Sequence, residues 1–165
     1  MLAVSRDIGH VRTRHDGAVC ICGNVGCLEA SASARAIATR LGLDDVEALL
    51  GRVLAADPTA VRMLRDAAIE IGEVVAMLVH FYNPASVVLG GQLARMSDDV
   101  LAGVRSIVYR RALPLATRSL TIENALHGER GGVVGGIVLG VEAALAPEAL
   151  ALSVANRRAG DARGR

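Results

Sequence analysis

Three cysteines and a histidine gather near the start of the chain, and together they could bind a metal ion. The segment from residue 7 to residue 30, DIGHVRTRHDGAVCICGNVGCLEA, holds His10 together with Cys20, Cys22 and Cys27, which are all the cysteines of the 165-residue chain. One imidazole and three thiolates form a ligand set that suits tetrahedral zinc. Four protein ligands leave no open coordination position, so such a zinc ion would be structural.

The spacing alone leaves alternatives open. Both His10 and His15 lie in the segment, so either could supply the nitrogen ligand. The three cysteines could instead be buried, inert thiols beside a solvated histidine. A disulfide is not expected, because three cysteines cannot all pair within one chain. Gly23 and Gly26 favour a metal site, since glycine lets the backbone fold tightly where a side chain would crowd the ion.

Two carboxylates lie at the ends of this segment and could accept hydrogen bonds from the hydroxyl groups of a ligand. Asp7 precedes His10, and Glu29 lies two residues after Cys27, in the first turn of an expected helix. Each has a simpler explanation. Asp7 could be a solvated loop residue, and Glu29 could favour the helix dipole.

A glycine pair ends the apolar run VVLGG. Gly90 and Gly91 follow an expected strand and precede an expected helix, where the backbone can approach a ligand closely. A tight strand-to-helix connection explains the same pair without a ligand. His80, near the end of a helix, and His127, in an expected loop, are assigned structural roles.

The composition limits the class of protein. The chain is 52% hydrophobic and 2% aromatic, with a formal net charge of +1. This apolar content is enough for the core of one domain and excludes a disordered chain. The basic residues are spread along the chain, so no surface for nucleic acid is indicated. The start does not resemble a signal peptide, and the apolar stretch over 131–141 is too short to span a membrane. We therefore expect a cytoplasmic protein.

The apolar pattern predicts the order loop, three helices, strand, helix, strand, helix. Residues 1–27 are expected to hold the end of a strand and a long loop. Helices are expected at 28–41, 44–57, 58–82, 97–113 and 131–146, and strands at 85–91 and 119–125. The last helix is expected to be largely buried and to stop at Pro147, and residues 151–165 are expected to form a disordered tail.

The helix over 58–82 has the strongest signals. Asp57 is its expected N-cap and Pro58 its first residue. Ser97 is expected to cap the helix that follows the first strand. Apolar residues recur at alternating spacings of three and four along the long helix, at Val61, Leu64, Ala68, Ile71, Val75, Leu78 and Tyr82. A stripe this wide predicts a homodimer formed through the helical face.

This order of elements predicts an α/β fold that is rich in helix and has a small mixed sheet. Two or three strands cannot form a well-covered sheet, so an apolar face is expected to lack its partner. The chain is therefore expected to be a piece of a larger fold.

The motif DIGH, followed by CICGNVGCLEA, resembles the signature of the ROK family. This family contains sugar kinases and sugar-responsive transcriptional repressors built on the actin-like ATPase, or ribonuclease H-like, fold. The resemblance implies that residues 1–150 are the C-terminal lobe of such a domain, with a zinc loop over residues 7–30. It also implies His10 as the nitrogen ligand of a structural zinc ion and places His15 on the loop surface.

The resemblance further implies roles in ligand binding. Asp7, His10 and Glu29 would bind a sugar, and Gly90 and Gly91 would lie beside the adenosine of ATP. ATP and Mg²⁺ would matter only in a complete kinase, because the family's phosphate loop and catalytic Asp belong to an N-terminal lobe that this sequence lacks. We therefore do not expect this chain to phosphorylate sugar by itself.

Three functions are compatible with the resemblance. The first is the sugar-binding, dimer-forming portion of a ROK transcriptional regulator that senses a hexose or hexose derivative and binds DNA only through an upstream segment. Asp7 favours this function, since kinases of the family more often carry Glu there. The second is the C-terminal half of an ATP-dependent sugar kinase similar to a glucokinase. The third is a zinc-stabilised dimerisation remnant without a ligand.

Overall fold

A computed structural model describes residues 7–151 of the chain. The chain divides into two compact units, one ending at Ala125 and the other beginning at Leu126. Residues 1–6, where the end of a strand was expected, lie outside the described residues. The tail expected over 151–165 also lies outside them, except for Ala151.

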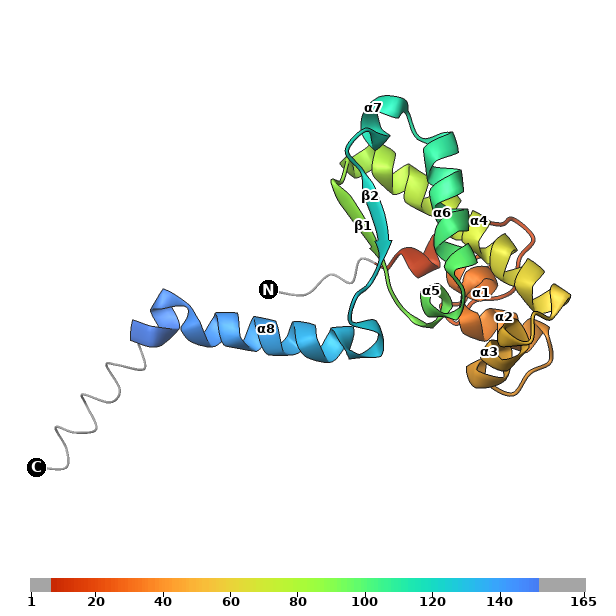
Figure 1. Ribbon diagram of the computed structural model, residues 1–165, viewed down its shortest axis with the longest axis horizontal. Coiled ribbons are helices and arrows are strands. Elements are labelled where there is room, and N and C mark those ends of the chain that lie inside the picture. Colours follow the sequence, from red (N-terminus) through yellow and green to blue (C-terminus); the bar gives the residue numbers. More distant parts are fainter. Residues whose placement is uncertain (1–6, 152–165) are drawn as a thin grey trace, which may run out of the picture. The chain divides into compact units, whose positions relative to one another are not determined.

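The long helices and the two strands follow one another in the predicted order, but the helix expected over 28–41 is divided and the short helices α5 and α7 were not predicted. The first unit contains η1 (Ile8–His10), α1 (Leu28–Ala32), α2 (Ala34–Arg40), α3 (Val46–Leu54), α4 (Pro58–Tyr82), β1 (Ser86–Leu89), α5 (Gln92–Met96), α6 (Asp98–Arg111), α7 (Pro114–Thr117) and β2 (Thr121–Asn124). The second unit contains η2 (Gly128–Arg130) and α8 (Gly131–Leu145). Figure 1 labels the α-helices and the two strands along the coloured chain.

The long helix α4 begins where the sequence predicts. The side chain of Asp57 accepts hydrogen bonds from the backbone N–H groups of Thr59 and Ala60, at 2.8 and 3.0 Å. These bonds lower the pKa of the Asp57 carboxyl, and Pro58 occupies the first helical position. The helix ends at Tyr82, and the next residue, Asn83, adopts a left-handed conformation with φ of 43°. An N-cap carboxylate and a first-turn proline therefore set the start of α4.

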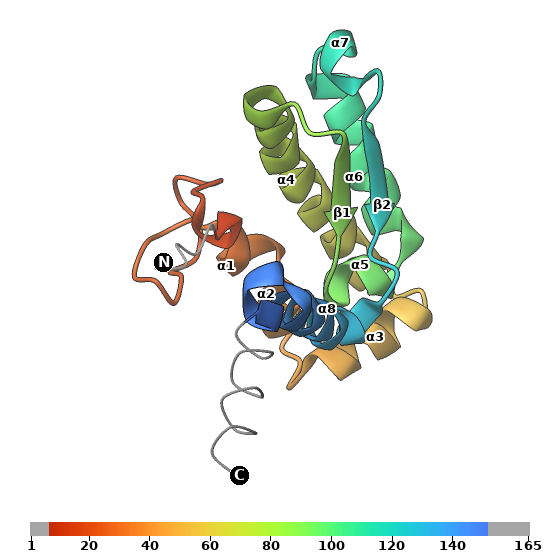
Figure 2. The same cartoon turned by 90° about the vertical axis from the view of Figure 1, so that its left-hand side faces the viewer.

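Helices α4 and α6 lie side by side and form the centre of the first unit (Figures 1 and 2). Two glycines let them approach closely. A Cβ atom on Gly72 would lie 2.7 Å from Cβ of Ile107, and one on Gly103 would lie 2.8 Å from Cβ of Ala68. The buried core around this contact includes Leu64, Val75, Val79, Val100, Val104 and Val108.

The predicted apolar stripe of α4 is therefore used largely within the chain. Leu64, Ala68 and Val75 of the stripe are buried, and α6 packs along this helix. Tyr82, the last helical residue and the last residue of the predicted stripe, is exposed. The stripe alone no longer supports a dimer through this face.

Strands β1 and β2 pair in parallel. Two side chains of α6 bond the backbone of β2 and of the residue directly before it. Nε of Arg105 donates to the carbonyl oxygen of Ile122 at 2.7 Å, and the hydroxyl of Tyr109 donates to the carbonyl oxygen of Leu120 at 3.1 Å. Both described strands are joined by a crossover through α5, α6 and α7, and such a connection suits parallel strands. The small sheet of the described residues is therefore parallel and not mixed.

The single helix expected over 28–41 is wrong, because the chain breaks at Ser33. The backbone of Ser33 is extended, and its side chain accepts a hydrogen bond from the N–H of Ala36 at 3.1 Å. Serine bonds nearby backbone groups readily, so it favours a cap over a helix interior. The result is two short helices, α1 and α2. Ser97 is confirmed as the N-cap of α6, since it accepts from the N–H of Asp99.

Helix α8 was expected to be largely buried. It ends at Leu145, before Pro147 as predicted, and its own unit buries none of its fifteen residues. The apolar content of a helix indicates that another element should cover it, but does not identify that element. Within its own unit, η2 is too short to cover it. Among residues 7–151, no helix combines the length and apolar character needed to cross a membrane.

Candidate functional site

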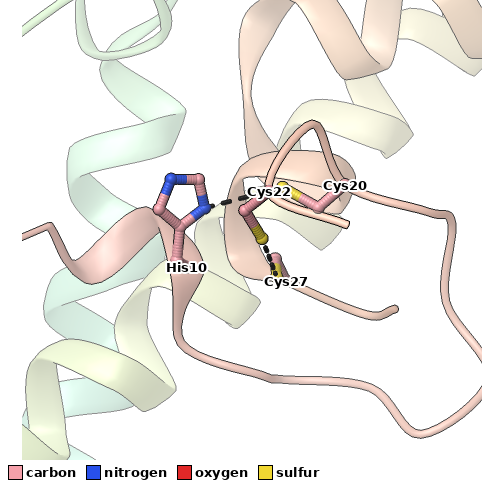
Figure 3. A group of neighbouring side chains, drawn as sticks. All are labelled: His10, Cys20, Cys22 and Cys27. Carbon is pink, nitrogen blue, oxygen red and sulfur yellow. Dashed lines mark hydrogen bonds between the residues drawn. The ribbon is translucent and has the colours of Figure 1, made fainter. Parts of the chain in front are cut away.

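His10 and the three cysteines converge in the loop between η1 and α1. Their ligand atoms all lie within 4.8 Å of one another. Nδ1 of His10 lies 3.5 Å from Sγ of Cys20, and Sγ of Cys22 lies 3.6 Å from Sγ of Cys27 (Figure 3). In a zinc tetrahedron with Zn–S bonds of about 2.3 Å, neighbouring ligand atoms are separated by about 3.5 to 3.8 Å. The donor set and these two distances fit zinc, so the four residues could hold such an ion.

The structure distinguishes the two histidines that the spacing left open. His10 joins the cluster, whereas His15 is exposed and is not part of it. The backbone carbonyl of His15 accepts a hydrogen bond from Nη2 of Arg12 at 2.9 Å, which ties this part of the loop to itself.

Two glycines shape the loop around the thiols, as the sequence predicted. Gly23 and Gly26 have φ of +85° and +78°, a backbone conformation that favours glycine. A Cβ atom on Gly26 would also collide with the carbonyl oxygen of Arg14. The N–H of Gly23 donates to the carbonyl oxygen of Cys20 at 2.9 Å and closes the tight turn.

The thiols differ in their acidity. Cys22 is exposed, and the backbone N–H of Asn24 lowers the pKa of its thiol to about 7. Cys27 is fully buried, and burial raises the pKa of its thiol to about 11. A metal ion binds thiolates, so its binding would release protons from the cluster.

Asp7 and Glu29 both lie close to Gly9. A Cβ atom on Gly9 would lie 3.0 Å from Oδ1 of Asp7 and 3.3 Å from Oε2 of Glu29. Oδ1 of Asp7 accepts a hydrogen bond from the N–H of Gly9 at 2.8 Å, and Oδ2 lies 3.5 Å from Nε2 of His10. The ring of His10 therefore has one nitrogen toward Cys20 and the other toward Asp7. The structure brings together the three residues that were predicted to bind a sugar.

A cavity of about 650 Å³ joins the two predicted ligand sites. Asp7, Gly9 and Glu29 line one part of it, and Gly90 and Gly91 line another. His10 borders a neighbouring hollow instead, together with Arg12, Asn24 and Cys27.

The glycine pair makes a tight connection from β1 to α5. Gly91 has φ of +91° and stands directly before the first residue of α5. A Cβ atom on Gly90 would make an ordinary contact, 3.7 Å from Cβ of Ala125. The conformational need for glycine is therefore strongest at Gly91.

Sequence reasoning missed Glu70, a residue of α4 that ties the loop to the helices. Its carboxylate accepts hydrogen bonds from the hydroxyl of Ser31 at 2.6 Å and from Nε of Arg14 at 2.9 Å, and Nη2 of Arg14 also contacts it. Partial burial favours the neutral form, but the bonds from Arg14 and Ser31 outweigh it and lower the pKa of Glu70. The same pair raises the pKa of Arg14. The one available signal was an acidic residue between Ile69 and Ile71.

Comparisons with known proteins agree with the motif. The sequence model of the ROK family matches residues 3–143. The xylose repressor of Caldicellulosiruptor bescii is 28% identical over 151 residues, covering 81% of this chain and 38% of the repressor. A glucokinase of Halalkalibacterium halodurans is 29% identical over 150 residues, covering 79% of this chain and 46% of the enzyme. The chain thus spans less than half the length of these curated relatives.

A solved structure shows the same architecture. The ROK family glucokinase from Streptomyces griseus, in complex with glucose and AMPPNP, aligns with a TM-score of 0.68 and 25% identity. The alignment covers 82% of this chain and 51% of that protein. This likeness confirms the actin-like ATPase fold of ROK proteins for the matched part. Because the match to the family extends over most of the sequence, the chain belongs to the ROK family.

Proposed function

We propose that this chain is the sugar-binding, zinc-containing portion of a ROK transcriptional regulator that senses a hexose or hexose derivative. The observation that carries the proposal is the convergence of Asp7, His10 and Glu29 beside a donor set that fits zinc. The adjoining cavity of about 650 Å³ falls within the size range of small-molecule sites.

The residues suggest how a sugar would be held. The carboxylates of Asp7 and Glu29 would accept hydrogen bonds from neighbouring hydroxyl groups, and Gly9 has no side chain to crowd them. His10, Cys20, Cys22 and Cys27 would hold the zinc ion, and zinc would fix the thiolates and the imidazole ring in place. Nε2 of His10 would then remain available to Asp7 or to a sugar hydroxyl.

The regulator is preferred because Asp7 stands where kinases of the family more often carry Glu. The similar proteins include a repressor and a glucokinase, so both branches of the family remain relevant. In the regulator, DNA would be bound by a segment upstream of this sequence.

The alternative is the C-terminal half of an ATP-dependent ROK sugar kinase. Gly90 and Gly91 line the same cavity as the two carboxylates, which is the observation that favours it. ATP and Mg²⁺ would then bind between this portion and a lobe that carries the phosphate loop and the catalytic Asp. This portion would be inactive alone.

Three further features belong to the proposal. Residues 1–150 would form the C-terminal lobe of a ROK domain that acts in the cytoplasm. The protein would form a homodimer. Because α6 covers most of the apolar stripe of α4, the dimer would use exposed apolar residues such as Met77 and Phe81 instead.

Sugar binding by the purified chain tests this function. We expect an NMR titration with glucose, xylose and N-acetylglucosamine to detect binding of one of them, and Glu29→Ala to weaken it about 10- to 100-fold, the value of a hydrogen bond to a charged group. Glu47→Ala is the matched control, since Glu47 is also an exposed acidic residue in the first turn of a short helix. Equal affinity in Glu29→Ala and wild type would contradict the assigned role.

A further inference from the structure

The chain on both sides of Cys27 is tied to α4 through Glu70. On the C-terminal side, Ser31 of α1 donates to the Glu70 carboxylate at 2.6 Å, and its hydroxyl oxygen lies 3.4 Å from the carbonyl oxygen of Cys27. Ser31 is buried, so this contact is shielded from water. One hydrogen bond therefore links Glu70 to α1, the short helix that begins directly after Cys27.

On the N-terminal side, the contact runs through the strand-like segment that precedes the cysteines. The N–H groups of Thr13 and Arg14 donate to the carbonyl oxygen of Gly26, at 2.8 and 3.1 Å. Nε of Arg14 and the hydroxyl of Thr13 in turn donate to Glu70, at 2.9 and 3.4 Å. Gly26 is the residue directly before Cys27. The carboxylate of Glu70 therefore binds residues that contact the chain on both sides of Cys27.

Glu70 itself is firmly placed. Its side chain is 13% exposed, whereas that of Arg14 is 49% exposed. Two residues further along α4, Gly72 packs directly against Ile107 of α6. A mostly buried carboxylate needs its partners, because leaving it unpaired costs free energy. The carboxylate of Glu70 is therefore a fixed negative charge on α4, and Thr13 and Arg14 of the loop bind to it.

We propose that Glu70 is the positioning residue of the metal site. Through Arg14 and Ser31 it fixes the two segments that flank Cys27, and so brings the ligand atoms together before a metal ion binds. Glu70 is not itself one of the four candidate ligands, and its hydrogen bonds go to Thr13, Arg14 and Ser31. The inference rests on the proposed metal site and adds a residue that the ROK motif does not include.

The chain supplies a matched control. Glu73 lies on the same helix and pairs with Arg111 of α6, with Oε1 of Glu73 2.8 Å from Nη2 of Arg111. This pair resembles that of Glu70 and Arg14 in chemistry but joins two helices instead of a helix and the loop. A general effect of removing a charge from α4 would therefore appear in both Glu70→Gln and Glu73→Gln.

Zinc affinity, measured by competition with a chromophoric chelator, tests the proposal. We expect Glu70→Gln to weaken zinc binding about 10- to 100-fold, as loss of a supporting residue does in other metal sites, and Glu73→Gln to leave it unchanged. In the metal-free protein, amide hydrogen exchange over residues 12–27 should also be faster in Glu70→Gln than in wild type or Glu73→Gln.

The outcomes separate the two proposals. Absence of zinc binding by the wild type would contradict the proposed metal site. Zinc binding by the wild type that Glu70→Gln retains in full would overturn only the role of Glu70. If Glu70→Gln does not fold, Arg14→Gln removes the same ion pair from an exposed side chain, and wild-type zinc affinity in that variant would overturn the proposal equally.

Discussion

The loop over residues 7–27 and the α4–α6 pair are held in different ways. The helix pair buries apolar side chains and uses Gly72 and Gly103 for close approach. In the loop, Cys20 and Cys27 are the buried hydrophobic residues, and the other contacts are hydrogen bonds and the ion pair at Glu70. Hydrophobic burial therefore supplies most of the stability of the helix pair, whereas polar contacts order most of the loop, and the proposed metal ion would add to them.

The largest expected effect is in the helix pair. Leu64 is 1% exposed, so Leu64→Ala should lower the free energy of unfolding by about 2 to 5 kcal/mol through lost burial and a new cavity. Urea unfolding measures this loss. Leu54→Ala is the control, because Leu54 is 76% exposed and its replacement should change stability by less than about 0.5 kcal/mol. Equal losses in the two variants would contradict the assigned core.

A smaller effect is expected on the free energy of unfolding at low pH, where protonation of Glu70 should weaken its contacts with the loop. The pKa of Glu70 is lowered from 4.5 in the folded chain, so on acidification the unfolded chain takes up the proton first. The stabilisation from Glu70 is complete above its unfolded value and is lost as the pH falls through the folded pKa.

Glu70→Gln should therefore flatten the decline in the free energy of unfolding between about pH 5 and pH 3, measured with a chelator present throughout so that the metal state stays constant. The pKa of Asp57 is also lowered, so Asp57 adds the same pH dependence to wild type and variant. Part of the decline in the free energy of unfolding should therefore remain in both proteins. Parallel curves for the two proteins would show that Glu70 contributes nothing to the pH dependence.

Local signals explain what the sequence could predict of the fold. Asp57 and Pro58 placed the start of α4 because capping and proline preferences depend on adjacent residues alone. Ser33 was missed because serine is tolerated within a helix, and its cap bond becomes visible only with the backbone in place. The burial expected for α8 is not supplied by its own unit, because the apolar content of a helix does not reveal which element lies beside it.

In the candidate site, too, residues close in sequence could be predicted, whereas contacts between distant residues could not. The motif predicted the ligand set of His10 and the cysteines because these residues lie close in sequence, and the structure brings their atoms together. Glu70 meets Arg14 and Ser31 across long sequence separations, so no local pattern could indicate it. The cavity shared by the two carboxylates and the glycine pair likewise depends on tertiary structure.

The zinc content of the purified chain is the most direct test of the proposed site. After exposure to zinc and removal of excess ion, we expect about one zinc per chain in wild type and in His15→Asn, and none in Cys27→Ser. His15→Asn is the matched control, since it removes the neighbouring histidine that lies outside the cluster. A folded wild-type chain without zinc, or Cys27→Ser with full zinc content, would contradict the account.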